Sequence, residues 1–198
     1  YSPEFLESLW TRFPHIYFVI DSSYSYFTQA SLPDPSETIH RFPNVIFVTS
    51  LTKRYAMPGL RLGYVMATRE VIQRLSAYAA PWSVGSLAIA AGEWIVKHHF
   101  PHLLDRDQLF AESRRLWNAI DALPYFEPQP TETHFFLVGC THPSIPTGEV
   151  LKSLLALRYG LLVRDATNFG YSAPTIRIAT QRPEENDLLI AALTELSS

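Results

Sequence analysis

VIFVTSLTKRYAMPGLRLGYVM, residues 45–66, is the stretch on which the interpretation of the whole chain depends. It opens with Val45 to Val48, an apolar and largely β-branched run that predicts a buried strand. Small hydroxyl side chains follow this strand, and Lys53 comes directly after them. Lysine is the amine that forms Schiff bases with carbonyl compounds. Many lysines in polar turns are only solvated, and the spacing alone leaves both interpretations open.

The composition is that of a globular protein. Of the 198 residues, 47% are hydrophobic and 18% are charged, which is enough apolar material for one good core or two small ones. The net charge of -3 shows no excess of basic residues that would indicate nucleic-acid binding. The single cysteine, Cys140, excludes an internal disulfide. We find no apolar stretch long enough to span a membrane and no signal peptide. We therefore expect a cytoplasmic protein without a nucleic-acid or membrane partner.

Expected helices alternate with expected strands along the chain. The helices cover 4–12, 37–42, 70–79, 87–98, 103–123 (after a break at Pro101), 148–159 and 184–196. The strands cover 16–20, 45–50, 63–67, 133–139, 161–164 and 175–180, and the first has the continuous apolar character of a buried parallel strand. This alternation predicts an α/β fold, in which ligands bind beyond the carboxyl ends of strands. Asp21 and the turn 49–53 both lie at such ends.

The order of residues around Lys53 is more specific than its spacing. The pattern S-x-T-K-x-x-x-x-P-G-L-R-x-G-Y, from Ser50 to Tyr64, resembles the lysine motif of fold-type I enzymes that use pyridoxal 5'-phosphate (PLP). This class includes histidinol-phosphate aminotransferases and threonine-phosphate decarboxylases. The resemblance covers essentially the whole chain. It implies that Lys53 binds PLP covalently and that the fold is the α/β fold of the PLP-dependent transferases, also called aspartate aminotransferase-like.

Fold-type I enzymes are considerably longer than this chain, so the resemblance implies the C-terminal portion of a longer protein. Residues 1–100 would then be the C-terminal part of the large PLP-binding domain, which has a mixed or parallel sheet. Residues 101–198 would form a connecting helix and a small α+β domain. The family's ring-stacking aromatic residue, its O3′ asparagine and a glycine-rich phosphate turn would precede Tyr1. Because the family is dimeric, with sites at the subunit interface, we expect a homodimer, and a chain of this extent alone should be inactive.

Asp21 closes an apolar run, and a carboxylate there costs free energy unless it is paired. It could simply cap a turn. The resemblance of Asp21-x-x-Tyr24 to the D-x-x-Y motif of the family implies that Asp21 pairs with the protonated pyridine nitrogen of PLP, which keeps the ring able to accept electrons. The same motif implies that the hydroxyl of Tyr24 bonds the O3′ oxygen of PLP, whereas a tyrosine in a polar loop is otherwise often a packing residue.

Ser50, Thr52 and Arg61 are the candidates for binding the phosphate of PLP. A dianion needs several donors and a positive charge, and arginine offers a planar fork of donors. Arg61 could alternatively form a surface salt bridge. The proline and the glycines around it favour a tight, positioned segment, and the resemblance assigns all three residues to the phosphate.

Two arginines near the C-terminus are the candidates for binding substrate. Arg177 lies in an expected strand where the family places the arginine for the substrate carboxylate; without the resemblance it would be a solvated outward residue. Arg164 lies in LLVRDATNFG, residues 161–170, which resembles the L-I-R-D-x-x-N-F/Y segment of threonine-phosphate decarboxylases. It could otherwise be a charge at the end of a strand. Together the two arginines suit a small substrate with both a carboxylate and a phosphate.

Residues 81–84, PWSV, likewise resemble the P-W-S-V of the decarboxylases. Two departures from the family pattern concern the substrate more than the cofactor. Gly85 stands where these decarboxylases carry an asparagine, and His134 replaces an asparagine that is usual in the class. His134 could contact substrate or be a strand residue without a chemical role. The other histidines lack metal-ligand spacing with carboxylates or cysteine, so we expect no metal site.

The resemblance therefore implies PLP-dependent decarboxylation of L-threonine O-3-phosphate to 1-aminopropan-2-ol O-phosphate, for cobalamin biosynthesis. Lys53 and Asp21 would be the catalytic residues. A histidinol-phosphate type of aminotransferase shares every cofactor residue and differs in which bond at Cα breaks. A transcription regulator with an aminotransferase-like, PLP-sensing domain is a third alternative, and its DNA-binding segment would lie upstream.

Overall fold

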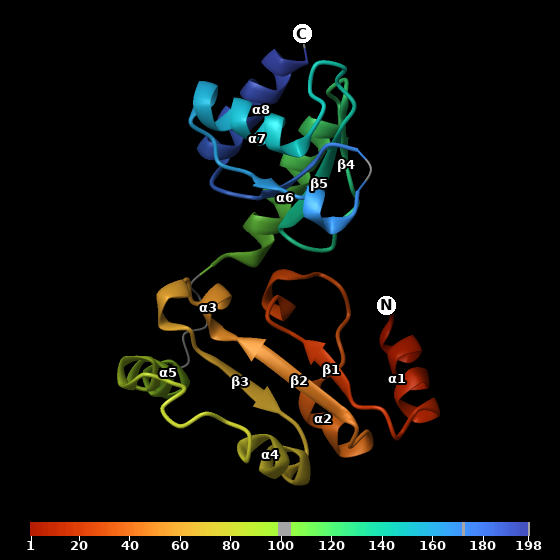
Figure 1. Ribbon diagram of the computed structural model, residues 1–198, viewed down its shortest axis with the longest axis vertical. Coiled ribbons are helices and arrows are strands. Elements are labelled where there is room, and N and C mark those ends of the chain that lie inside the picture. The colour runs from red at the N-terminus through yellow and green to blue at the C-terminus, as the bar shows by residue number, and fades with distance from the viewer. Residues whose placement is uncertain (99–103, 172, 198) are drawn as a thin grey trace. The chain divides into compact units, whose positions relative to one another are not determined.

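The computed structural model describes residues 1–98, 104–171 and 173–197. The chain divides into two compact units, Tyr1–Leu103 and Leu104–Ser198 (Figure 1). Both units combine helices with a β-sheet, which confirms the expected α/β class. The expected boundary at residue 100, the break at Pro101 and the expected helix start at Leu103 lie outside the described residues.

The first unit contains a three-stranded mixed sheet in the order β1-β2-β3. β1 (Phe18–Asp21) is parallel to β2 (Val45–Ser50), and β2 is antiparallel to β3 (Gly63–Met66). The helices and 3-10 turns of this unit are α1 (Pro3–Arg12), η1 (Ser25–Phe27), α2 (Pro35–Arg41), α3 (Leu51–Arg54), η2 (Pro58–Leu60), α4 (Arg69–Ser76) and α5 (Ser86–His98).

α1 and α2 pack on one face of this sheet. Trp10 of α1 is 1% exposed and packs against Val45 and Phe47 of β2. Phe42, which follows α2, meets the Trp10 ring edge-on at 5.3 Å. Full burial of side chains of this kind stabilises a fold by about 1.5–3 kcal/mol each. The strand that leads to Lys53 is therefore held by the core of the first unit.

The opposite face of the sheet is covered over β2 but left open over β1. Ile46 lies on that face and is buried next to Val71 of α4. Val19 is paired with Ile46 in the parallel ladder, and its side chain is 63% exposed. The parallel pairing expected for this strand is confirmed. The predicted burial of β1 on both of its faces is wrong, because the apolar groups of α4 reach β2 and not Val19.

The second unit contains a four-stranded sheet in the order β4-β5-β7-β6, with antiparallel neighbours throughout. Its strands are β4 (Phe126–Pro128), β5 (Phe135–Cys140), β6 (Arg164–Asp165) and β7 (Thr175–Ala179). Its helices are α6 (Arg106–Asp121), α7 (Gly148–Tyr159) and α8 (Pro183–Leu196), with a 3-10 turn η3 (Thr167–Phe169) before β7.

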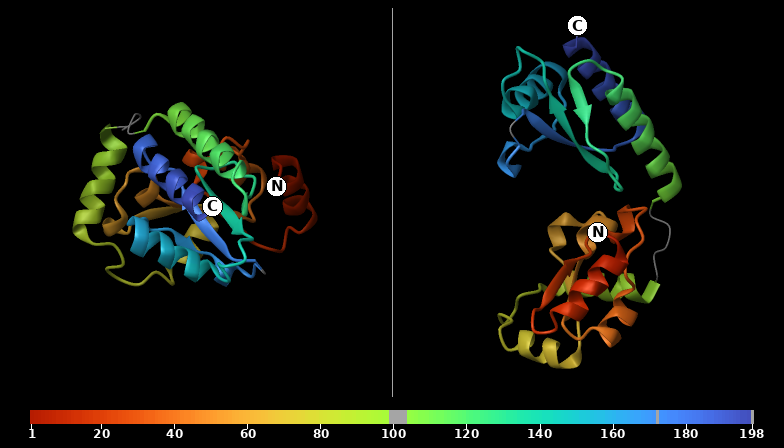
Figure 2. Two further views of the ribbon diagram at one scale, coloured as in Figure 1. Left: turned by 90° about the horizontal axis from the view of Figure 1, so that it is seen from above. Right: turned by 90° about the vertical axis from the view of Figure 1, so that its right-hand side faces the viewer.

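All three helices of the second unit contribute to one core on one face of its sheet (Figure 2). Leu116 of α6, Leu155 of α7 and Leu193 of α8 are fully buried there. They share a cluster with Ile176 of β7. Because successive residues of a strand point to opposite faces, Arg177 lies on the face that is turned away from this core.

Two strand predictions differ from the structure. The strand expected over 161–164 is reduced to β6, because the chain before it still follows α7, with the Leu161 N–H donating to the Leu155 carbonyl. β4 was not expected. It ends in Pro128, and proline within a short apolar run argues against a strand in sequence. Pro128 is tolerated because β4 has only one neighbour, β5, and so lies at the edge of the sheet.

Within the described residues, no helix combines the length and the apolar character needed to cross a membrane. The same part of the chain contains no group of three or more His, Cys, Asp and Glu side chains that could hold a metal ion. Cys140 is buried in the core of the second unit, and this burial raises the pKa of its thiol.

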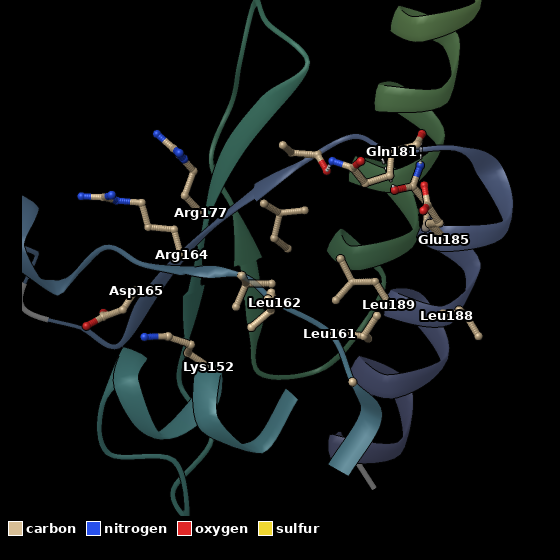
Figure 3. A pocket seen from close by; sticks show the side chains of 15 residues that line it. Lys152, Leu161, Leu162, Arg164, Asp165, Arg177, Gln181, Glu185, Leu188 and Leu189 are labelled. Carbon is tan, nitrogen blue, oxygen red and sulfur yellow. Dashed lines mark hydrogen bonds between the residues drawn. The ribbon is translucent and has the colours of Figure 1, made fainter. Parts of the chain in front are cut away.

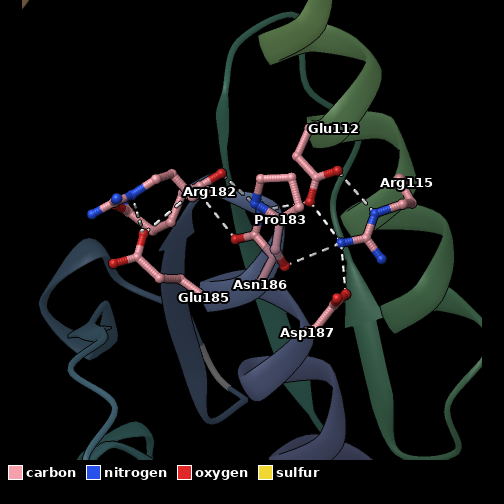
Figure 4. Close-up of polar contacts among 8 residues, drawn as sticks. Glu112, Arg115, Arg182, Pro183, Glu185, Asn186 and Asp187 are labelled. Carbon is pink, nitrogen blue, oxygen red and sulfur yellow. Dashed lines mark hydrogen bonds and ion pairs between the residues drawn. The ribbon is translucent and has the colours of Figure 1, made fainter.

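A polar network joins α6 to α8 in the second unit (Figure 4). Asn186 is 1% exposed, and its amide donates to Glu112 Oε1 at 2.8 Å and to the Gln181 carbonyl at 2.9 Å. Arg115 donates two hydrogen bonds to the Glu112 carboxylate and forms an ion pair with Asp187. The Arg115 guanidinium lowers the pKa of Glu112, while burial opposes this effect.

Replacement of Glu112 with glutamine should weaken this network at neutral pH. We expect the free energy of unfolding to fall by about 1.5–3 kcal/mol near pH 7, because hydrogen bonds to a charged group are worth about this much. A lowered native-state pKa stabilises the fold above the unfolded-state value near 4.5. That contribution is lost as the pH falls through the native-state pKa, so the difference between the two proteins should close. Urea titrations at neutral and acidic pH measure this difference in the free energy of unfolding.

Glu185→Gln is the matched control. Glu185 pairs with Arg182 at 3.6 Å on the surface, where their side chains are 49% and 82% exposed. Exposed pairs contribute little, so this variant should lose less than about 0.5 kcal/mol at either pH. Equal losses in the two variants, or a Glu112→Gln difference that persists in acid, would contradict the role given to Glu112.

Candidate active site

The carboxyl ends of β1 and β2 lie next to each other because the two strands are parallel, and Asp21 is the last residue of the shared ladder. Beyond that ladder the same register continues through side chains. Ser22 Oγ lies 2.6 Å from Thr49 Oγ1. Ser23 Oγ accepts a hydrogen bond of 3.0 Å from the Ser50 N–H. The loop after β1 is thereby fixed against the turn after β2.

Asp21 is exposed at the mouth of this sheet and is held by the residues that follow it. The Ser23 N–H donates to Asp21 Oδ1 at 3.0 Å. Hydrogen bonds from the Ser23 side chain and then from its backbone lower the pKa of Asp21, against a small opposing effect of burial. The carboxylate is therefore ionised at neutral pH and can pair with a cationic ligand group.

The turn that carries Lys53 is a single helical turn, α3, which the sequence did not predict. Ser50 is its N-cap, and the Ser50 hydroxyl accepts from the Thr52 N–H at 3.3 Å. Ser50 Oγ and Thr52 Oγ1 lie 2.7 Å apart. Thr52 is buried, whereas Lys53 is exposed. The structure thus brings together the two hydroxyls that were expected to bind phosphate, directly before the lysine.

Lys53 and Tyr24 face each other across the gap between the two loops. The Lys53 Nζ lies 5.9 Å from the centre of the Tyr24 ring, within the range of a cation–π contact. The next residues repeat the arrangement, with the Arg54 guanidinium 4.5 Å from the centre of the Tyr26 ring. Sequence reasoning did not single out Tyr26 or Arg54. Both residues follow closely after Tyr24 and Lys53 in the sequence, and this proximity is the signal that could have identified them.

Arg61 is near this turn in the backbone, but its side chain is directed elsewhere. It adopts the left-handed conformation, with φ 49°, and its guanidinium donates to the Pro58 carbonyl at 3.1 Å. Gly63 closes the turn beside Ser50 in the β2–β3 ladder, and a Cβ there would lie 2.8 Å from the Thr49 carbonyl oxygen. Of the three expected phosphate ligands, the structure joins Ser50 to Thr52 and leaves Arg61 bonded to its own turn.

Arg164 and Arg177 are direct cross-strand partners in the antiparallel pair β6–β7 of the second unit. Their side chains therefore share one face of the sheet. The Arg164 guanidinium lies 5.5 Å from the centre of the Phe169 ring, and that of Arg177 lies 5.6 Å from the centre of the Phe135 ring. Within the described residues, neither arginine has a carboxylate within ion-pair distance.

The two arginines line a groove of about 890 Å³ that runs along β6 toward α8. Figure 3 shows both guanidinium groups extended toward one end of this groove, while the leucines of 161–162 and 188–189 line the other end. The arginine end also carries Lys152 and Asp165, and the leucine end also carries Gln181 and Glu185, so the positive charge is gathered at the arginine end. A small dianionic ligand matches the cationic end.

Asp165 fixes the loop that follows Arg164. Its Oδ1 accepts hydrogen bonds from the N–H and the hydroxyl of Thr167, and these lower the pKa of Asp165, the side-chain bond more than the backbone bond. Gly148, the first residue of α7, packs so closely here that a Cβ would lie 2.7 Å from the Thr175 carbonyl oxygen. This segment, expected to discriminate among substrates, is thus tied to both α7 and β7.

The two residues that depart from the family pattern, His134 and Gly85, lie directly before β5 and directly before α5. His134 precedes β5; its carbonyl accepts from the Thr180 N–H at 2.8 Å, and burial lowers the pKa of its imidazole. Trp82 is 98% exposed with a φ of 61°, and Gly85 caps the start of α5 through its carbonyl, which accepts from the Ile89 N–H. None of these contacts assigns a chemical role to His134.

Comparisons with known proteins bear on the whole chain. It is 31% identical over 153 residues to a threonine-phosphate decarboxylase of Salmonella typhimurium, covering 76% of this chain and 41% of that protein. It is 26% identical over 180 residues to histidinol-phosphate aminotransferase 2 of Archaeoglobus fulgidus, covering 91% of this chain and 50% of that protein. The chain thus spans about half the length of the curated relatives it matches.

A solved structure extends the likeness to three dimensions. The crystal structure of L-threonine-O-3-phosphate decarboxylase from Porphyromonas gingivalis superimposes with a TM-score of 0.91 at 32% identity, covering 99% of this chain and 59% of that chain. The fold is accordingly that of the PLP-dependent transferases, as expected from the motif around Lys53. The family model for aminotransferase class I and II matches residues 1–193. On these grounds the chain belongs to the aminotransferase class I and II family.

Proposed function

We propose that Lys53 binds PLP covalently and that the protein decarboxylates L-threonine O-3-phosphate to 1-aminopropan-2-ol O-phosphate. The observation that carries this proposal is the pair formed by Arg164 and Arg177, which stand in direct register on the sheet face turned away from the core. The similarity to threonine-phosphate decarboxylases, at 31% and 32% identity, supports the same assignment.

The side chains at the ends of β1 and β2 fit PLP by their chemistry. PLP carries an aldehyde, a basic ring nitrogen and a phosphate, so a site for it needs an amine, an anion and several donors. Lys53 offers an exposed amine, and Asp21 offers a carboxylate that the adjacent hydrogen bonds keep ionised. Ser50 and Thr52 offer two hydroxyls 2.7 Å apart.

Two further side chains would complete this set. The Arg61 guanidinium would add charge to the phosphate site in place of its bond to the Pro58 carbonyl. The Tyr24 hydroxyl would bond the O3′ oxygen of the ring, because its own ring already faces Lys53. When bound, PLP supplies an electron sink for the carbanion that forms at the substrate Cα. Asp21 would hold the proton on the ring nitrogen that this sink requires.

Arg164 and Arg177 would bind and orient the substrate. Like charges directly opposite each other on neighbouring strands destabilise a sheet, so an anionic partner relieves a cost that is already present. An arginine fork binds a carboxylate or a phosphate through two parallel hydrogen bonds. We assign the substrate carboxylate to Arg177 and the substrate phosphate to Arg164. Fixing both groups determines which bond at Cα stands ready to break.

A PLP-dependent aminotransferase of the histidinol-phosphate type is the second candidate. It is favoured by the 26% identity over 180 residues to the Archaeoglobus fulgidus protein, a match that covers 91% of this chain, against 76% for the Salmonella typhimurium decarboxylase. Every cofactor residue would keep its role. The difference lies in the pose of the substrate, since a Cα–H bond rather than the bond to the carboxylate would break.

We further propose that the protein acts as a homodimer in the cytoplasm, in cobalamin biosynthesis. Leu87 and Val96 of α5 are apolar and are 78% and 67% exposed, which is compatible with a subunit contact. The buried position of the single cysteine suits a reducing compartment. A small phosphorylated amino acid is the partner that the two arginines favour.

Lys53→Ala in the full-length protein should abolish the covalent adduct that borohydride reduction fixes between PLP and the chain. The reason is that Lys53 supplies the amine that forms this bond. Mass spectrometry of the reduced protein detects the adduct and its position. Lys97→Ala, which removes an exposed lysine in the last turn of α5, should keep it. An adduct that survives in Lys53→Ala would reject Lys53 as the anchor.

Incubation of the full-length protein with PLP and L-threonine O-3-phosphate separates the two candidate activities. A decarboxylase should release CO2 and 1-aminopropan-2-ol O-phosphate without any amino acceptor, because the amine stays on the product. We expect this outcome, measured by trapped carbonate and by mass spectrometry of the amine. Amine transfer that depends on an added 2-oxo acid, with no CO2, would replace the decarboxylase proposal with the aminotransferase.

Arg164→Gln should remove the preference for the phosphorylated substrate. We expect kcat/KM for L-threonine O-3-phosphate to fall about 100-fold, because a hydrogen-bonded charge pair contributes about 1.5–3 kcal/mol. The value for unphosphorylated L-threonine should change less than about threefold, since Arg164 has no phosphate to bind there. Arg158→Gln, which breaks a surface pair with Glu195 on the same unit, is the matched control. Equal losses on both substrates would exclude the phosphate role.

A further inference from the structure

Ser23 lies between two of the residues assigned to PLP, Asp21 and Ser50, and contacts both. We propose that Ser23 is a positioning residue that couples Asp21 to the turn carrying Ser50 and Lys53. This inference rests on the proposed binding of PLP at that turn. It concerns a residue to which neither the motif around Lys53 nor the D-x-x-Y pattern gave a role.

The contacts of Ser23 are specific and directional. Its hydroxyl accepts from the Ser50 N–H at 3.0 Å, a bond between residues 27 positions apart in the chain. The backbone N–H of Ser23 donates to Asp21 Oδ1, also at 3.0 Å. Ser23 thus links the end of β1, through its backbone, to the N-cap of α3, through its hydroxyl.

This link crosses the point where the parallel backbone ladder stops. The β1–β2 pairing ends at Asp21 and Val48, followed by a backbone bond of 2.8 Å from the Ser22 N–H to the Val48 carbonyl. The contacts described beyond that bond are made by side chains. Ser22 provides one such contact, with Thr49 and the Val48 carbonyl. The Ser22 hydroxyl contacts β2, whereas Ser23 contacts Asp21 and Ser50.

Ser23 therefore sets the spacing between the anion expected at the ring nitrogen and the hydroxyl expected at the phosphate. PLP is a rigid ring with these groups at fixed positions, so an error in this spacing costs binding at one end or the other. A displaced Asp21 carboxylate would hold the protonated ring nitrogen less firmly.

Ser23→Ala in the full-length protein, with Ser22→Ala as its matched neighbour, tests the proposal. We expect the dissociation constant for PLP to rise about tenfold in Ser23→Ala and less than about twofold in Ser22→Ala, because only the first loses the hydrogen bond to the N-cap of α3. Absorbance of the bound cofactor against pH is the second measurement. Its midpoint should move upward in Ser23→Ala, since a ring nitrogen that holds its proton less firmly withdraws fewer electrons from the nitrogen joined to Lys53. Ser23→Thr, which keeps the hydroxyl, should restore both values.

The outcomes separate this inference from the function on which it rests. If wild-type protein and Ser22→Ala bind PLP, and Ser23→Ala matches them in affinity and absorbance midpoint, then only the role of Ser23 is overturned. If Ser22→Ala weakens PLP as much as Ser23→Ala does, the coupling is not specific to Ser23 and the proposal also fails. If the wild-type protein itself binds no PLP, the proposed function falls and this inference falls with it.

Discussion

The parallel pairing of β1 with β2 is the constraint on which the candidate site depends. Parallel strands end at the same edge of a sheet, so Asp21 and the hydroxyl-rich turn before Lys53 meet although they are far apart in the chain. The apolar side chains of β2 pack under α1 and α2 and fix that edge in place. The Ser22 N–H makes one further backbone bond, to the Val48 carbonyl, and past it the Ser23 hydroxyl bonds the turn before Lys53.

In the second unit, successive side chains of β7 point to opposite faces of the sheet, so core residues and candidate binding residues alternate along one strand. On β7, Ile176 and Ile178 face the three helices and are buried, and Arg177 between them faces the other way. Arg164 reaches the same face because the two residues are paired across β6 and β7. Two aromatic rings lie against the guanidinium groups. The like charges are thus presented together on a face that the core does not use.

The sequence predicted the elements that have strong local signals and missed what depends on neighbours. Apolar runs located β2 and β7, and the motif around Lys53 identified the family and so the fold, because that order of residues is rarely met by chance. The exposure of Val19 was missed, because one strand alone does not show what covers its second face. Ser23 was missed because its partner lies 27 positions away, and only the strand register connects them. The roles assigned to Lys53, Asp21 and the two arginines stay predictions.

The way the two loops are joined has a consequence for how this segment tolerates insertions and deletions. Residues 28–34, which precede α2, have no buried side chain, and the register at the site is set by the strands rather than by the length of this stretch. Long surface connections add little closure entropy, about 0.6 kcal/mol for each doubling. Length changes there should be accepted by relatives, whereas a single residue added between Asp21 and Tyr24, or between Val48 and Lys53, would put every later contact out of step.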